Sequence, residues 1–150
     1  MIINARSETA TKALGARLGG LLRGGEVVEL IGDVGAGKTT LAKGIGEGLK
    51  IDEPIASPSF TISRLYSARD GLQLAHYDFY RLLDAGLMAD ELAEAIDQPD
   101  SITLIEWGEV VAGVLPRDRL TINIESPTVL GRRLSLSAGG PVSQALVDRL

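Results

Sequence analysis

This chain of 150 residues contains no cysteine and a single histidine. Without cysteine it can form neither a disulfide nor a thiolate metal site, and one histidine cannot build a zinc site from imidazole ligands. It also has no apolar run near the roughly 20 residues that a membrane span requires. Its first residues, Met1 to Asn4, turn polar too soon for a signal peptide. These absences favour a cytoplasmic protein with no membrane segment.

Basic charge is scarce as well, because 20 acidic residues against 15 Lys and Arg give a net charge of −5. A protein that binds a nucleic acid on its own usually presents a net basic surface. The one local cluster of arginines is interrupted by acidic residues and is typical of solvated strand ends. Its members are Arg117, Arg119, Arg132 and Arg133. We therefore expect that a partner holds most of any RNA.

Glycine, by contrast, is abundant, and three glycines shape the most informative segment of the chain. Residues 32–39 read GDVGAGKT and fit the phosphate-binding loop G-x-x-x-x-G-K-[ST]. A mostly apolar run at 26–31 is typical of a buried strand that enters the loop, and residues 39–49 are typical of the helix that leaves it. Glycine lets successive N–H groups turn towards phosphate oxygens, and the helix N-terminus adds the positive end of a dipole.

This loop predicts a role for each of its polar residues. Lys38 would place its ammonium on the β- and γ-phosphates, the Thr39 hydroxyl would ligate Mg²⁺, and Thr40 would lie close to the α-phosphate. A glycine turn with a purely structural role is the alternative. The predicted nucleotide-binding residues of the loop are Gly35, Ala36, Gly37, Lys38, Thr39 and Thr40.

Hydrolysis also needs a carboxylate that holds Mg²⁺ opposite the loop. Residues 101–106 predict a buried strand that ends in Glu106, in the manner of a Walker B acid. A strand at 72–78 ends in Asp78, with His76 on the same face. Asp78 could orient the attacking water, join the metal shell or cap a turn, and His76 could be a core histidine. The predicted catalytic residues are Lys38, Asp78 and Glu106, and the predicted metal ligands are Thr39 and Glu106.

The remaining pattern alternates helices and strands. It predicts a helix that begins at 7–9 and stops before Gly24, a helix at 84–96 and another at 141–150. It predicts strands at 60–66, 119–125 and 132–137, the first paired with 72–78 around the turn dipeptide Asp70-Gly71. We expect one domain of the α/β class, a P-loop NTPase-like mixed sheet with a mostly parallel core, added antiparallel strands and helices on both faces. Its site would lie at the carboxyl ends of the strands.

Three features stay open at this point. Residues 57–60, Ser-Pro-Ser-Phe, could sense the γ-phosphate or form a stiff connector. Arg81 could pair with a phosphate or with an acid, and Trp107 could pack in the core, against the nucleotide or against a partner. Neither an arginine finger nor a second acid directly after Glu106 is evident, so turnover without a partner should be slow.

Together, these motifs resemble the small bacterial TsaE-type ATPases of tRNA threonylcarbamoyladenosine biosynthesis. The likeness runs from 11–15 through the phosphate-binding loop and SPSFT at 57–61 to HYDFYRL at 76–82, IEW at 105–107 and GR at 131–132. The H-x-D-x-Y-R-L and E-W elements are specific, and the match covers nearly the whole chain. Three departures are Ser59 in place of the usual Thr, Gly108 in place of the commoner Pro, and a loose match over 83–99.

The resemblance implies an ATPase that assists the complex placing threonylcarbamoyl on N6 of adenosine 37, in tRNAs that read codons beginning with A. The implied cofactors are ATP and Mg²⁺. The implied partners are the transferase subunit and its non-catalytic paralogue, TsaD and TsaB, with tRNA met only through that complex. Thr11 would sit near the nucleotide base, Thr39 and Glu106 would hold Mg²⁺, and Asp78 would belong to the catalytic or switch region.

Two other functions remain open. In a small-molecule kinase, Asp78 would be the base for a substrate hydroxyl, but such kinases usually carry an Arg-rich lid, and here the late arginines fall on predicted strands. In a nucleotide-gated scaffold, ATP would be bound without any need for turnover.

Overall fold

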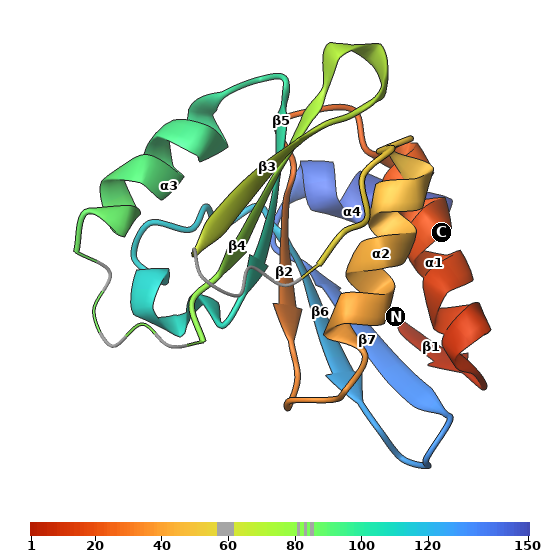
Figure 1. Ribbon diagram of the computed structural model, residues 1–150. Helices are drawn as coiled ribbons and strands as arrows, with labels where there is room; N and C mark the ends of the chain where they lie inside the picture. The colour runs from red at the N-terminus through yellow and green to blue at the C-terminus, as the bar shows by residue number, and fades with distance from the viewer. Residues whose placement is uncertain (57–61, 81, 83, 85) are drawn as a thin grey trace.

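The computed structural model of the chain describes residues 1–56, 62–80, 82, 84 and 86–150, and a seven-stranded sheet organises them (Figure 1). In spatial order the strands run β1-β7-β6-β2-β5-β4-β3. Their bounds are β1 Ile2–Ala5, β2 Val27–Ile31, β3 Ser63–Ser67, β4 Gln73–Asp78, β5 Ser101–Glu106, β6 Leu120–Glu125 and β7 Arg132–Ala138.

The centre of the sheet is parallel and its edges are antiparallel. Strands β6, β2, β5 and β4 run parallel to one another, whereas the pairs β6–β7 and β7–β1 at one edge and β4–β3 at the other are antiparallel. The predicted mixed sheet with a mostly parallel core is therefore confirmed. Because the four central strands are parallel, their carboxyl ends meet at one edge of the sheet.

Helices cover both faces of this sheet, as predicted. Helices α1 and α2 lie on one face, and α3 lies on the other (Figure 1). Buried residues of α4 join the same apolar cluster as those of α1 and α2, while Leu92 of α3 packs in a second cluster with Tyr77 and Ile105. The helices are α1 Glu8–Leu21, α2 Lys38–Gly48, α3 Met88–Asp97 and α4 Pro141–Arg149, with short 3₁₀ turns at η1 Arg69–Gly71 and η2 Gly108–Val111.

Helices α1 and α2 touch backbone to backbone through four glycines, two on each helix and four residues apart. A Cβ at Gly15 would lie 2.4 Å from the Leu41 carbonyl oxygen, and a Cβ at Gly44 would lie 2.1 Å from that of Lys12. The same holds for Gly19 and Gly48, whose added Cβ would lie 2.2 Å from a carbonyl oxygen of the opposite helix. No side chain larger than hydrogen fits at these four positions without moving a helix.

The carboxyl ends of both helices are joined by Arg69, in the turn between β3 and β4. Its guanidinium donates to the carbonyls of Gly19, Gly20 and Leu22 at the end of α1. Its backbone N–H donates to the Leu49 carbonyl at the end of α2, over 2.8 Å. A cation at two helix C-termini also complements their dipoles.

The predicted turn at Asp70-Gly71 is present, with a φ of 57° at Asp70 and 74° at Gly71.

Two elements differ from the prediction. The edge strand β1 was not expected, because its four residues carry only two large apolar side chains, Ile2 and Ile3, too few for a recognisable alternation. Helix α3 begins at Met88 instead of 84, and Leu87, which lies within the predicted range, is outside the helix and 85% exposed. The predicted strand at 60–66 is observed from Ser63, and residues 57–61 lie outside the described part of the chain.

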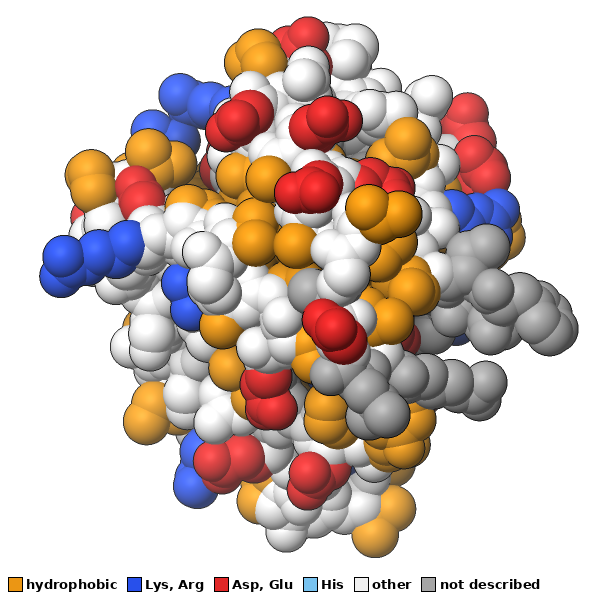
Figure 2. Space-filling view, turned by 90° about the vertical axis from the view of Figure 1, so that its left-hand side faces the viewer, with side chains coloured by type: hydrophobic (Ala, Val, Ile, Leu, Met, Phe, Trp, Pro, Cys, Tyr) orange, Lys and Arg blue, Asp and Glu red, His pale blue; other side chains and the backbone are white. Residues whose placement is uncertain are grey.

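The surface over α3 is acidic. Figure 2 shows Asp and Glu side chains spread over this face, with Lys and Arg confined to its rim. Four of the ten residues of α3 are acidic, namely Asp90, Glu91, Glu94 and Asp97, and none is basic. Such a face would repel a phosphate backbone.

In the described residues, no helix is both long and apolar enough to cross a membrane.

The glycine contact between α1 and α2 predicts a large effect of one methyl group. Gly44→Ala should lower the free energy of unfolding by about 1–3 kcal/mol, because its Cβ collides with backbone atoms that cannot rotate away. Gly20→Ala, on α1 with no atom within 4 Å of the added Cβ, should leave stability unchanged or raise it by up to about 1 kcal/mol through helix propensity. Chemical unfolding of both variants checks this, and equal losses would contradict the close contact.

Candidate functional site

The carboxyl ends of β2, β5 and β4 bring the predicted site residues together. Leu30 on β2 pairs with Glu106 on β5, and Glu106 pairs with Asp78 on β4, so these residues lie at one level of the sheet. The phosphate-binding loop leaves β2 directly after this level, as Lys38 begins α2. The structure therefore brings the loop and both predicted acids together at the carboxyl edge of the sheet.

The loop curls over the start of α2 as the motif requires. Gly35 and Gly37 have φ angles of 82° and 110°, in the left-handed region that favours glycine. The Ala36 N–H donates to the Asp33 carbonyl over 3.0 Å, which closes the turn. Alternating backbone conformations of this kind point successive N–H groups into one concave surface, the geometry of an anion site.

Lys38 lies at the centre of the site and is 7% exposed. Its ammonium donates to the Gly32 carbonyl at the start of the loop and lies 4.0 Å from the centroid of the Trp107 ring. Burial lowers the pKa of Lys38, and the nearby carboxylates of Glu106, Asp78 and Asp33 act in the opposite direction. The ammonium is thus partly desolvated and directed towards acidic groups, so oxygen ligands would be attracted strongly.

Glu106 and Asp78 occupy different environments. Glu106 is 2% exposed, and its Oε2 lies 2.7 Å from Nε2 of His76, itself 1% exposed. Asp78 is half-buried and accepts the N–H of Tyr80 over 3.0 Å, so it caps the turn that follows β4. Burial raises the pKa of Asp78, and the charge of Glu106 adds to this increase, while the hydrogen bond from the Tyr80 N–H and the charge of Lys38 oppose it.

Trp107 follows Glu106 in an unusual backbone conformation, with a φ of 56°. For a bulky residue this is strained, at a cost on the order of 1–3 kcal/mol. The ring lies on Lys38 and contacts Tyr80, with centroids 4.9 Å apart. Tyr80 is 56% exposed. The strained backbone therefore turns the indole over the site rather than fully into the core.

A cavity of about 310 Å³ lies beside the helix end of the loop. It brings Thr11 of α1 next to the loop. The place of Thr11 near the nucleotide base stays a prediction. Arg132 also lines the cavity, and its Nε would lie 3.3 Å from a Cβ added at Gly37. The Arg132 guanidinium donates to the carbonyls of Thr128, Val129 and Gly131. The lining residues are Glu8, Thr11, Gly35, Gly37, Lys38, Thr39, Thr40, Val129, Leu130 and Arg132.

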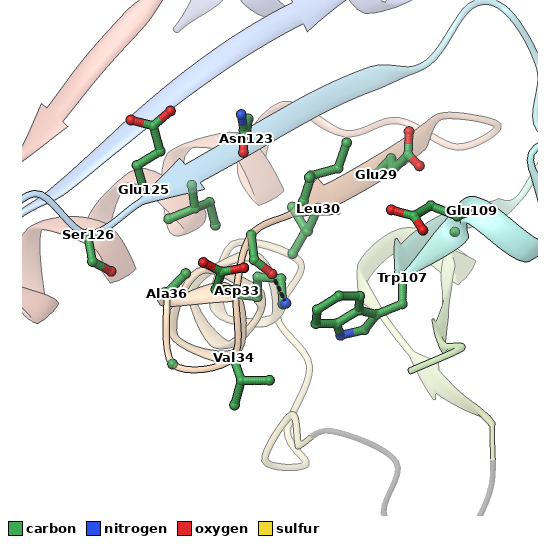
Figure 3. A pocket seen from close by; sticks show the side chains of 16 residues that line it. Glu29, Leu30, Asp33, Val34, Ala36, Trp107, Glu109, Asn123, Glu125 and Ser126 are labelled. Carbon is green, nitrogen blue, oxygen red and sulfur yellow. Dashed lines mark hydrogen bonds between the residues drawn. The ribbon is translucent and has the colours of Figure 1, made fainter. Parts of the chain in front are cut away.

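A larger cavity, of about 580 Å³, lies on the opposite side of the loop. Figure 3 shows Trp107 and Glu109 along one side of it and Asn123, Glu125 and Ser126 along the other. Four carboxylates line it, from Glu29, Asp33, Glu109 and Glu125, against the single cation of Lys38. Glu29 is paired with Arg119 over 2.9 Å, so that arginine is not the solvated strand end we expected. Among the described residues, Glu106 and Asp78 line neither cavity.

The residues fit ATP with Mg²⁺ better than a metal ion alone. No three His, Asp or Glu side chains of the described residues gather in a way that could hold a metal without help. A magnesium site of this type takes one or two protein oxygens and completes its shell with phosphates and water. Thr39 begins the helix beside the loop, and the buried Glu106 acts on the charge of Lys38, so the donor set has the required chemistry.

Some predicted residues cannot be placed, and one was missed. The segment 57–60, including Ser59, and Arg81 lie outside the described residues. Arg132 was left without a role, because its proximity to the loop arises only when β7 folds beside β6 and returns the chain to Gly37. The pair Gly131-Arg132 in the resemblance was the one signal that pointed to it.

Comparison with known proteins agrees with this geometry. The profile of the TsaE family, described as threonylcarbamoyl adenosine biosynthesis protein TsaE, matches residues 5–134. The tRNA threonylcarbamoyladenosine biosynthesis protein TsaE of Streptomyces coelicolor is 43% identical over 115 residues, covering 76% of this chain and 78% of that protein. The TsaE of Bacillus subtilis is 36% identical over 143 residues, covering 93% of this chain and 87% of that protein.

A solved structure shares the fold. The crystal structure of Bacillus subtilis YdiB superimposes with a TM-score of 0.78 at 34% sequence identity. The match covers 99% of this chain and 91% of that one, so it includes the antiparallel edges as well as the parallel core.

The raised pKa of Asp78 predicts a stability that depends on pH. A folded-state pKa above the unfolded value means that the folded protein binds this proton more tightly, so ionisation of Asp78 costs stability as the pH rises above about 3.9. Asp78→Asn should therefore be more stable than the wild type at neutral pH, and its advantage should shrink as the pH falls through the range of Asp titration. Chemical unfolding at several pH values checks this.

The control for that experiment is Asp52→Asn, at an exposed position outside the site. It should show no comparable advantage. An advantage of Asp78→Asn that stays constant down to acidic pH would contradict the electrostatic explanation.

Proposed function

This chain belongs to the TsaE family of threonylcarbamoyl adenosine biosynthesis proteins, and we propose that it serves that pathway as a Mg²⁺-dependent ATP-binding protein with weak ATPase activity. The observation that carries the proposal is the position of the phosphate-binding loop. It lies between a cavity lined by Thr11 and Arg132 and the buried carboxylate of Glu106.

The nucleotide is assigned to the smaller cavity on grounds of charge. That cavity contains the loop glycines, both threonines of the helix start and the guanidinium of Arg132, with Glu8 as its one acid. The larger cavity contains four carboxylates and would repel a triphosphate. Thr11 and Arg132 then flank the base or ribose, while the loop holds the phosphates. Arg132 is suited to this because three carbonyls hold its side chain in place.

Each polar residue of the site has a distinct task in this proposal. Lys38 exchanges the Gly32 carbonyl for phosphate oxygens and neutralises their charge. Thr39 and Glu106 hold the metal ion, which when bound supplies Lewis-acid stabilisation of the phosphate oxygens. Asp78, at the same level as Glu106 and with a raised pKa, orients the attacking water and is suited to accept its proton. The Trp107 ring over Lys38 excludes water from that side.

Slow turnover follows from the few cations at the site. Of the described residues that line the two cavities, only Lys38 and Arg132 are cationic, and Arg132 already donates to the Thr128, Val129 and Gly131 carbonyls between β6 and β7. Besides the metal ion, one ammonium must then offset most of the charge that develops on the transferred phosphoryl group. A partner that supplies a further cation accelerates such reactions by about 10³–10⁵-fold.

The partners in this proposal are the TsaD- and TsaB-type subunits of the threonylcarbamoyl transferase complex, with tRNA reached through them. The acidic balance of the chain and the acidic face over α3 support an indirect contact with RNA. The kinase alternative gains no support from the late arginines. Arg132 and Arg133 belong to β7, and Arg119 is tied to Glu29, so they do not form a lid.

Removal of the loop lysine should abolish most of the affinity for ATP. A charged hydrogen bond is worth about 1.5–3 kcal/mol, so Lys38→Ala should weaken binding by about tenfold to a hundredfold. Lys43→Ala, an exposed lysine on the same helix, should bind like the wild type. Calorimetry with a non-hydrolysable ATP analogue and Mg²⁺ measures both, and equal affinities of the two variants would refute the assigned site.

Turnover should depend on the partner and on Asp78. ATP hydrolysis by the protein alone should be slow and should rise by about tenfold or more when TsaD- and TsaB-type subunits are added. Asp78→Asn should keep its affinity for the ATP analogue and lose about a hundredfold or more of the turnover rate. Unchanged turnover in Asp78→Asn would exclude its catalytic role. Phosphate transferred to a small acceptor, in place of free phosphate, would establish the kinase alternative.

A further inference from the structure

The carboxylate of Glu106 is buried together with the only histidine of the chain. His76 and Glu106 lie on the same face of the adjacent parallel strands β4 and β5, with His76 two residues before the level of Glu106. A buried carboxylate costs several kcal/mol unless it is paired and hydrogen-bonded. His76 supplies that partner directly, because its Nε2 lies 2.7 Å from Oε2 of Glu106.

The second nitrogen of His76 shows which ring nitrogen carries the hydrogen. Nδ1 is buried and has no hydrogen-bond partner among the described residues. A hydrogen there would be an unsatisfied buried donor, at a cost of about 1–3 kcal/mol, whereas an unpaired lone pair is tolerated more readily. Nε2 therefore carries the hydrogen and donates it to Glu106, while Nδ1 carries only a lone pair.

We propose that His76 is a positioning residue, which fixes the Glu106 side chain by donating to Oε2 and so directs Oε1 towards the magnesium ion or its water. This inference rests on the proposed function. A glutamate side chain has three rotatable bonds, and a single directional donor removes most of that freedom without neutralising the charge. Lys38 also attracts the Glu106 carboxylate, but a point charge does not select one of the two oxygens.

The ring tautomer can be tested in the unmodified protein, because its one histidine gives one set of imidazole signals. Long-range ¹H–¹⁵N correlation spectra at mildly alkaline pH should show Nε2 protonated and Nδ1 unprotonated. Glu106→Gln should shift the Nε2 signal, since its acceptor changes, whereas Glu109→Gln, at an exposed acid three residues away, should not. A hydrogen on Nδ1, or an Nε2 signal indifferent to Glu106→Gln, would overturn the proposal.

The effect on the metal is tested with two substitutions. His76→Leu removes the donor, and His76→Gln keeps an N–H at comparable reach. In His76→Leu, the Mg²⁺ concentration needed for half-maximal binding of a non-hydrolysable ATP analogue should rise about 10- to 100-fold. Binding of the analogue without Mg²⁺ should stay unchanged, and His76→Gln should recover most of the Mg²⁺ dependence.

A purely structural histidine would give a different result. Both substitutions would then lower the free energy of unfolding and leave the Mg²⁺ dependence as in the wild type, and the positioning role would be refuted. If the wild type itself binds no nucleotide, the proposed function fails, while the tautomer spectrum still reports on the pair. Where His76→Leu does not fold, the spectra of the wild type and Glu106→Gln still test the hydrogen bond on which the proposal depends.

Discussion

The close contact between α1 and α2 sets the position of the site. Most helix pairs are held apart by side chains, but here glycines let two backbones meet, so the distance between the helices is set by main-chain atoms. The amino ends of both helices face the P-loop, since α2 begins with Lys38 and Thr11 lies in the first turn of α1. The same contact therefore fixes the proposed base end of the nucleotide site relative to its phosphate end.

The charged and strained groups at the carboxyl edge of the sheet lower the stability of the fold. Glu106 and Lys38 are buried, the surroundings of Asp78 raise its pKa and so disfavour its charge, and Trp107 has a strained backbone. Each of these would be unfavourable in an ordinary core. Two apolar clusters on either side of the sheet provide the stability that offsets them. The unfavourable groups all lie at one level of β4, β5 and the P-loop, which is the pattern expected of a site kept for its chemistry.

The parts of the fold that could be predicted are those encoded within a few consecutive residues. The P-loop, the strands at 27–31 and 101–106 and the turn at Asp70-Gly71 each carry a local pattern, and all are observed. The alternation of β4 also predicted that His76 and Asp78 share a face. The hydrogen bond between His76 and Glu106 depends on which strand pairs with β4. The alternation within one strand does not reveal its neighbour.

Contacts between distant segments, and very short elements, were not accessible in that way. Arg132 reaches Gly37 only because β7 folds next to β6, and β1 is a strand because β7 offers it a free edge. The glycines of α1 and α2 do have a visible spacing of four. In a chain with 18 glycines, however, this spacing had no special meaning until the two helices were seen to face each other.

The anchoring of Arg69 has a mechanical consequence for the strand that carries Asp78. The turn between β3 and β4 is fastened to the ends of α1 and α2, at the opposite end of the sheet from Asp78. Sliding of this hairpin along the sheet would break these bonds together with the ladder to β5. The anchored turn therefore holds β4, and with it Asp78, in a fixed register against β5 and Glu106.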